Sequence, residues 1–81
     1  MKMRKPTHPG ERFAEFVLNQ GLIISVAALA MGYRVQELRE VVDGAPLSIE
    51  MAEKWGIFTD TTTESWYNMQ VAFDEWEIEN V

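Results

Sequence analysis

The chain contains no cysteine and a single histidine, so chemistry that depends on thiols or on clustered imidazoles has no residues to use. The lack of cysteine excludes disulfides and thiolate metal sites, and it agrees with a reducing compartment. A metal site at His8 would need carboxylates for its other ligands, so we interpret His8 as a capping or packing residue. The sequence also shows no Ser-His-Asp set and no phosphate-binding glycine loop. We therefore expect a protein that is not an enzyme and that holds neither metal nor cofactor.

Long hydrophobic runs are missing as well. No segment approaches the roughly 20 apolar residues of a membrane span, and no basic-then-apolar signal precedes a cleavage site. We therefore expect a cytoplasmic protein without membrane contact. The 81 residues, 47% of them hydrophobic and 25% charged, have the composition of one folded globular domain. A domain this small buries only roughly 60% of its unfolded surface, so dimer or partner contacts are expected to add stability.

Positive charge is scarce in the second half of the chain. Residues 43–81 hold nine carboxylates and one cation, Lys54, whereas residues 1–12 carry a net charge of +3. The acidic half would repel nucleic acid and suits a basic protein partner. Residues 1–7 have little apolar content and predict a mobile basic arm. Lys5 in this arm is a candidate for DNA phosphate contacts, and the alternative interpretation of the arm is a solubilising tail.

The spacing of capping and helix-ending residues predicts an all-α fold of five helices in a single domain over residues 8–81. Pro9 suits the first turn of a helix, Gly32 a helix end, and Ser48 a helix cap. The first four expected helices cover residues 9–18, 24–31, 35–42 and 48–58. The second and third, separated by Gly32, form a helix-turn-helix candidate. Small or apolar residues occupy the inward positions of this pair. They are Ala27, Ala28, Met31, Tyr33, Leu38 and Val41.

A long last helix is expected to run to Glu79, with a capping box in which Thr61 accepts an amide and Glu64 reaches back. Apolar residues recur along this helix at helical spacing in two stripes. The stripe predicted to face the core is Trp66, Met69, Phe73 and Trp76. The second stripe is Tyr67, Val71 and Ile78, and we interpret it as a dimer or partner surface because a monomer does not need it. We interpret the three tryptophans as core or interface anchors.

Several short motifs carry a resemblance to a known family. They are His8-Pro9-Gly10-Glu11, the frame residues Ala28, Gly32, Leu38 and Asp43-Gly44, Glu50-Met51-Ala52, and the last-helix residues Trp66, Asn68, Gln70, Ala72, Phe73, Asp74 and Trp76. Over roughly residues 8–76 the chain resembles the HigA/VapI-like antitoxins of the Cro/repressor-type helix-turn-helix family. The resemblance implies a lambda-repressor-like domain with a long C-terminal helix. It also implies a dimeric antitoxin that neutralises an RNA-cleaving toxin and represses its own operon.

The chain departs from the family's pattern where DNA should bind. Ile23 and Ile24 replace a polar pair that caps the second helix and holds a phosphate, and a basic residue after Asp43-Gly44 is missing. Direct readout of bases requires donors and acceptors on the third helix, which Arg34, Gln36 and Arg39 can supply. The alternative interpretation is a solvated helix face in which Arg34 pairs with Glu37.

Two functions therefore stay open. The first is a HigA-type antitoxin that binds a basic toxin through its acidic half and represses transcription as a homodimer. The second is a homologue without DNA binding that acts as a protein inhibitor or decoy, encoded by a phage or another mobile element. In both cases the candidate protein interface lies on the last helix. It comprises Tyr67, Val71, Glu75, Ile78 and Glu79.

Overall fold

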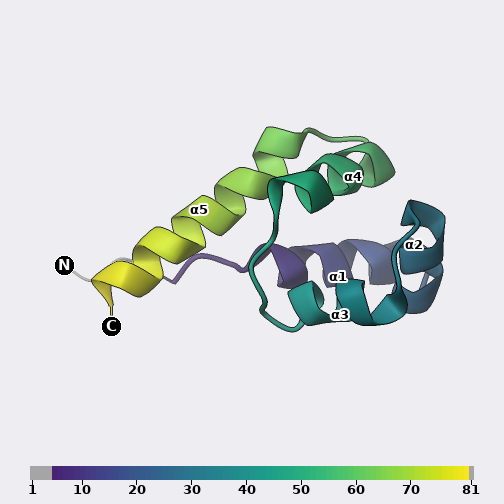
Figure 1. The fold of residues 1–81 in the computed structure, drawn as a ribbon, viewed down its shortest axis with the longest axis horizontal. Helices are drawn as coiled ribbons and strands as arrows, with labels where there is room; N and C mark the ends of the chain where they lie inside the picture. The colour runs from purple at the N-terminus through teal and green to yellow at the C-terminus, as the bar shows by residue number, and fades with distance from the viewer. Residues whose placement is uncertain (1–4, 81) are drawn as a thin grey trace.

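The computed structural model describes residues 5–80, and this part of the chain folds into five helices without a strand (Figure 1). The helices are α1 (Pro9–Asn19), α2 (Ile24–Met31), α3 (Val35–Val42), α4 (Ile49–Thr59) and α5 (Thr63–Glu79). The bounds of α2 and α3 agree with the sequence prediction, and the other bounds agree to within about one residue. Lys2 and Arg4 of the predicted arm lie outside the described residues.

Local capping interactions set the predicted helix starts. The His8 imidazole caps α1, because its Nδ1 accepts a hydrogen bond of 2.9 Å from the Gly10 amide. The Ser48 hydroxyl caps α4 by accepting from the Met51 amide at 3.1 Å. Each bond satisfies a backbone donor that has no partner inside the helix. The interpretation of His8 as a capping and packing residue is confirmed, since its buried ring also contacts Phe73 edge-on at 4.9 Å.

The predicted cap of α5 is wrong by one residue. The N-cap is Thr62, whose hydroxyl accepts from the Ser65 amide at 3.1 Å, and not Thr61. The Thr61 hydroxyl accepts a hydrogen bond of 3.0 Å from the Trp66 indole, which also donates one of 3.1 Å to the Thr59 hydroxyl of α4. Asp60 also adopts the left-handed conformation, with φ of 57°, and this turns the chain before the helix begins.

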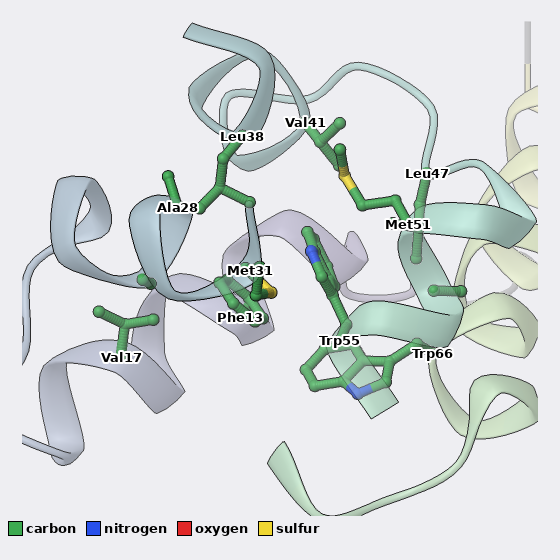
Figure 2. Packing of buried hydrophobic residues seen from close by; sticks show 12 residues of the cluster. Phe13, Val17, Ala28, Met31, Leu38, Val41, Leu47, Met51, Trp55 and Trp66 are labelled. Carbon is green, nitrogen blue, oxygen red and sulfur yellow. The ribbon is translucent and has the colours of Figure 1, made fainter. Parts of the chain in front are cut away.

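An aromatic cluster joins α1, α4 and α5 at the centre of the domain (Figure 2). Phe13 stacks on Trp55 with ring centroids 4.2 Å apart, and Trp66 meets Trp55 edge-on at 5.2 Å. All three side chains are buried. Such pairs contribute roughly 0.5–1.5 kcal/mol beyond the burial of their area. The assignment of Trp55 and Trp66 to the core is therefore confirmed.

The two helices of the helix-turn-helix pack on this cluster through small side chains. Ala27 and Ala28 of α2 are fully buried and let α2 approach its neighbours closely. Leu38 of α3 is also fully buried and points toward α2 in Figure 2. Of the predicted inward residues, only Tyr33 is half-buried rather than buried.

The second half of α5 extends beyond the rest of the molecule, as Figure 1 shows. The described part measures 41 Å in its longest dimension against 21 and 20 Å in the others. The predicted inward stripe of α5 is therefore buried in the core only at Trp66. Phe73 and Trp76 are half-buried, and the chain's own Lys5 and His8 lie against them.

Within the described residues, no single helix has the length and hydropathy of a membrane span. Only α1 and α2 taken together reach that length and composition, across a bend of 102°.

The start of α1 touches the end of α3 so closely that only glycine fits at residue 10. A Cβ atom on Gly10 would lie 2.2 Å from the Val41 carbonyl oxygen, which belongs to the backbone and cannot rotate away. We expect Gly10→Ala to lower the free energy of unfolding by at least about 1–3 kcal/mol, as overpacking does in cores. Urea unfolding followed by circular dichroism measures this loss. Asn19→Ala, at an exposed position of the same helix, is the control, and equal stability of both variants would contradict the prediction.

A buried side chain of α5 holds the loop between α3 and α4. Gln70, only 4% exposed, accepts a hydrogen bond of 2.9 Å from the Leu47 amide and donates one of 2.8 Å to Asp74. Replacing it by methionine keeps the volume but leaves the Leu47 amide buried without an acceptor, which costs about 1–3 kcal/mol.

We therefore expect Gln70→Met to destabilise the domain by that amount and to speed hydrogen exchange at the Leu47 amide. Asn68→Met, at an exposed amide of α5, should change neither the stability of the domain nor the exchange rate of the Leu47 amide. Normal protection of the Leu47 amide in Gln70→Met would refute this role of Gln70.

Candidate nucleic-acid and partner interfaces

The turn between α2 and α3 is fixed by a glycine and by a lysine from α4. Gly32 has a φ of 79°, a left-handed conformation that favours glycine and ends α2. The Lys54 ammonium donates a hydrogen bond of 3.3 Å to the Met31 carbonyl, and it lies 4.7 Å from the centroid of the Tyr33 ring. The single cation of the acidic half thus holds the end of α2, where the helix dipole is negative.

The three predicted DNA-reading residues all reach solvent from α3. Arg34 is the N-cap of the helix, and Gln36 and Arg39 lie within it, all exposed. The Glu37 carboxylate accepts a hydrogen bond of 3.1 Å from the Arg34 backbone amide. The expected pairing of Arg34 with Glu37 is therefore a helix cap and leaves the guanidinium exposed.

Carboxylates surround the start of α3. The pKa of the Tyr33 hydroxyl is raised, first by its burial and then by the negative charges of Glu37 and Glu50. Glu40 is a further exposed carboxylate on α3 itself. The candidate DNA surface therefore combines two cations with several carboxylates, which weakens its attraction for phosphate.

The start of α2 is apolar in this protein. Ile23 is the N-cap of the helix, makes no side-chain capping hydrogen bond and is 63% exposed. An isoleucine side chain can neither cap the free amides of the first turn nor bind a phosphate oxygen. Of the two isoleucines that depart from the family pattern, Ile23 is therefore on the surface, whereas Ile24 is half-buried and packs against the core.

Lys5, the predicted phosphate ligand of the arm, lies against α5. Its ammonium is 5.7 Å from the centroid of the Phe73 ring and 5.5 Å from that of Trp76. A cation at this distance from an aromatic face is attracted to it. A contact between Lys5 and DNA phosphate stays a prediction.

The predicted protein interface forms one outward face of α5. Tyr67 is half-buried, whereas Val71, Glu75, Ile78 and Glu79 are exposed. The spacing from Val71 to Glu79 places these four side chains on the same side of the helix. The structure therefore brings the apolar and acidic candidates together, on the part of α5 that projects from the domain (Figure 1).

Comparison with known proteins places the chain in a family. A Haemophilus influenzae protein described as an uncharacterised helix-turn-helix transcriptional regulator is 34% identical, over 99% of this chain and 77% of its own length. Antitoxin HigA-1 of Vibrio cholerae is 31% identical, over 95% of this chain and 74% of its own length. The chain belongs to the HigA-type family of helix-turn-helix regulators. No family model matches the sequence.

A solved structure with the same arrangement of helices confirms the fold. A Pseudomonas aeruginosa protein, crystallised with its operator DNA, matches with a TM-score of 0.86 and 27% identity, over 94% of this chain and 83% of that one. The predicted resemblance to HigA-type antitoxins and the predicted five-helix class are thus confirmed. The HigA-type relatives are regulators and antitoxins by description, and none of those compared is described as an enzyme.

Two residues that shape the site were not predicted as such from the sequence. Lys54 appeared only as the one cation of the acidic half, and Gln70 only as part of the family pattern. Their partners are 23 residues away along the chain in both cases. An isolated cation and an amide on a helix face predicted to be apolar are the signals that could have indicated these roles.

Proposed function

We propose that this HigA-type protein is an antitoxin that captures a basic toxin and represses transcription by binding operator DNA, and that it forms a homodimer. The observation that carries the proposal is an intact helix-turn-helix whose third helix presents Arg34, Gln36 and Arg39 to solvent. The membership in the HigA-type family supports the antitoxin role, and the operator complex of a structural relative supports the DNA role.

The DNA surface favours specific contacts over general attraction. Arg34 and Arg39 can each donate two hydrogen bonds to guanine, and Gln36 can pair with adenine. The nearby carboxylates Glu37 and Glu40 repel the phosphates, so the affinity for unrelated DNA should be low. Operator binding is therefore expected to depend on a few base contacts.

A titration with DNA from the gene's own upstream region, beside an unrelated duplex, tests the repressor role. We expect a preference for the upstream DNA at low and at moderate salt, with weaker binding as salt rises. The alanine variants of Arg34, Gln36 and Arg39 should each lose about 1–3 kcal/mol, at different base positions.

Lys5→Ala is the matched control for phosphate contacts, because a phosphate ligand lowers affinity uniformly across sequences. No preference for upstream DNA, or an equal loss for all base positions in the three α3 variants, would count against repression.

Two observations support the second function, that of a helix-turn-helix protein without DNA binding. The exposed Ile23 at the start of α2 and the carboxylates on α3 both oppose phosphate binding. A helix-turn-helix that has lost its operator would act through protein contacts alone, as an inhibitor or decoy. The absence of any DNA preference in the titration above would favour this function.

The acidic face of α5 is the proposed toxin surface. Glu75 and Glu79 are exposed on it beside Val71 and Ile78, and α5 contains no basic residue. Charges at an exposed rim mainly accelerate the encounter with a partner of opposite charge. We therefore assign the carboxylates to steering and the apolar side chains to the contact itself.

Charge reversal tests this assignment. Glu75→Lys and Glu79→Lys should slow association with the toxin that this antitoxin neutralises by about tenfold at low salt, with little change in dissociation. Surface plasmon resonance at two salt concentrations separates the two rates. Glu53→Lys on α4 makes the same charge change at another exposed site and serves as the control. An unchanged association rate at low salt would exclude this face as the steering surface.

A further inference from the structure

A hollow of about 290 Å³ lies where three parts of the chain meet. The segment before α1 passes along α5 there, and the end of α3 lies against the start of α1 (Figure 1). Two carboxylates line the hollow, Glu11 of α1 and Asp43 at the end of α3, together with the Phe73 ring of α5. A single water molecule needs only roughly 10–15 Å³ of such volume, so a ligand side chain has room. We call this site the α1–α3–α5 hollow.

The α1–α3–α5 hollow already holds a cation from the chain itself. The Lys5 ammonium lies 5.7 Å from the centroid of the Phe73 ring and 5.5 Å from that of Trp76. Lys5 lines the hollow with Glu11 and Asp43, yet within the described residues it forms no ion pair with either carboxylate. The aromatic faces therefore attract a positive charge, and the two carboxylates are left without a cation of their own.

The ends of two helices act on a charge in this hollow. Asp43 is the C-cap of α3, where the helix dipole is negative and favours a cation. The helix α1 begins on the other side, where the dipole is positive, but Glu11 in its first turn offsets that end. The sequence also lacks the basic residue that the family pattern places after Asp43-Gly44, so the α3 side brings no cation. These charges favour a cation from another molecule.

His8 adds a hydrogen-bond donor that lacks a partner. Its Nδ1 accepts from the Gly10 amide and so carries no hydrogen, which leaves the hydrogen of the neutral ring on Nε2. The residue is 6% exposed and lines the hollow, and among the described residues its Nε2 has no hydrogen-bond partner. A buried donor without an acceptor is costly. A ligand with an acceptor next to its cation would satisfy both His8 and the carboxylates.

An arginine residue of a protein has this combination. Its guanidinium is planar, stacks on aromatic rings and donates to two carboxylates at once, whereas the lysine ammonium is a compact, strongly hydrated point charge. The backbone carbonyl beside the arginine side chain supplies the acceptor for the His8 Nε2. The hollow therefore suits arginine better than the lysine that now lies in it.

We propose that the α1–α3–α5 hollow binds an arginine side chain of the toxin, between its two carboxylates and on the ring of Phe73. In the free protein Lys5 holds this place, and the arginine displaces it. The inference rests on the proposed function for the identity of the basic partner. Trp76 precedes Glu79 by three residues, so the hollow adjoins the acidic face of α5 and one partner can contact both.

Titration with N-acetylarginine-N-methylamide, which carries the guanidinium and backbone carbonyls, tests the site without any toxin. Chemical shifts of the Gly10 and Gly44 amides and of the Trp76 indole report binding. We expect saturable changes in the millimolar range, and about threefold weaker binding of the matching lysine derivative. The citrulline derivative has the same shape without the charge and should not bind. The absence of saturable changes, or equal binding of the citrulline derivative, would overturn the proposal.

Substitutions in the hollow should have effects of opposite sign. Glu11→Gln and Asp43→Asn should each weaken binding of the arginine derivative by about threefold, because each removes an opposite charge. Lys5→Ala should strengthen it by about threefold, because the hollow then has no internal competitor. Glu15→Gln, at an exposed carboxylate of α1 outside the hollow, is the control. Weaker or unchanged binding in Lys5→Ala, or equal affinities of Glu11→Gln and Glu15→Gln, would overturn the proposal.

The toxin then tests the assignment of the partner. The double variant Glu11→Gln/Asp43→Asn should speed dissociation from the toxin by about tenfold, because it removes a direct contact and not a steering charge. An unchanged dissociation rate would show that the toxin does not use the hollow and would overturn the proposal. A wild-type protein that binds no toxin would instead refute the proposed function, and the arginine titration would still decide whether the site exists.

Discussion

The stacking of Trp55 on Phe13 is the contact on which the rest of the domain depends. It ties α4 to α1, and Trp66 then joins α5 to the same cluster (Figure 2). The helix-turn-helix packs on this centre through Ala27, Ala28 and Leu38 and adds no charged side chain to it. Since the outward residues of α2 and α3 have no part in the core, they can change without loss of the fold. This explains how a complete helix-turn-helix can carry isoleucine where its family places polar residues.

The helices could be predicted because their ends have local causes. Gly32 ends α2 through its own backbone conformation, and Ser48 caps α4 through an amide three residues away. The start of α5 could not be placed in the same way. Its predicted cap, Thr61, accepts a hydrogen bond from the indole of Trp66, and the same indole also donates to Thr59 at the end of α4. Gly10 is a similar case, since its contact with Val41 arises from the approach of α1 to α3.

The residues of the candidate site could be predicted from the sequence, but the contacts that its charged side chains make could not. The exposure of Arg34, Gln36 and Arg39 agrees with the helix-turn-helix pattern. The sequence could not show that Lys5 and Lys54 lie over aromatic rings, because these rings belong to other helices or to a distant turn. A count of cations along the sequence therefore overstates the number of positive charges that are available to bind DNA. The exposed residues could be predicted because helix faces follow from local spacing. The partners of the cations could not, because they follow from tertiary packing.

In the free protein, the two proposed functional surfaces carry opposite charges that the chain itself does not fully neutralise. Arg39 stands beside apolar side chains at one end of the molecule, and Glu75 and Glu79 stand beside Ile78 at the other end. Operator DNA would supply negative charge to the first surface, and a basic toxin would supply positive charge to the second. The uneven distribution of charge along the chain therefore suits two different partners at two separate surfaces.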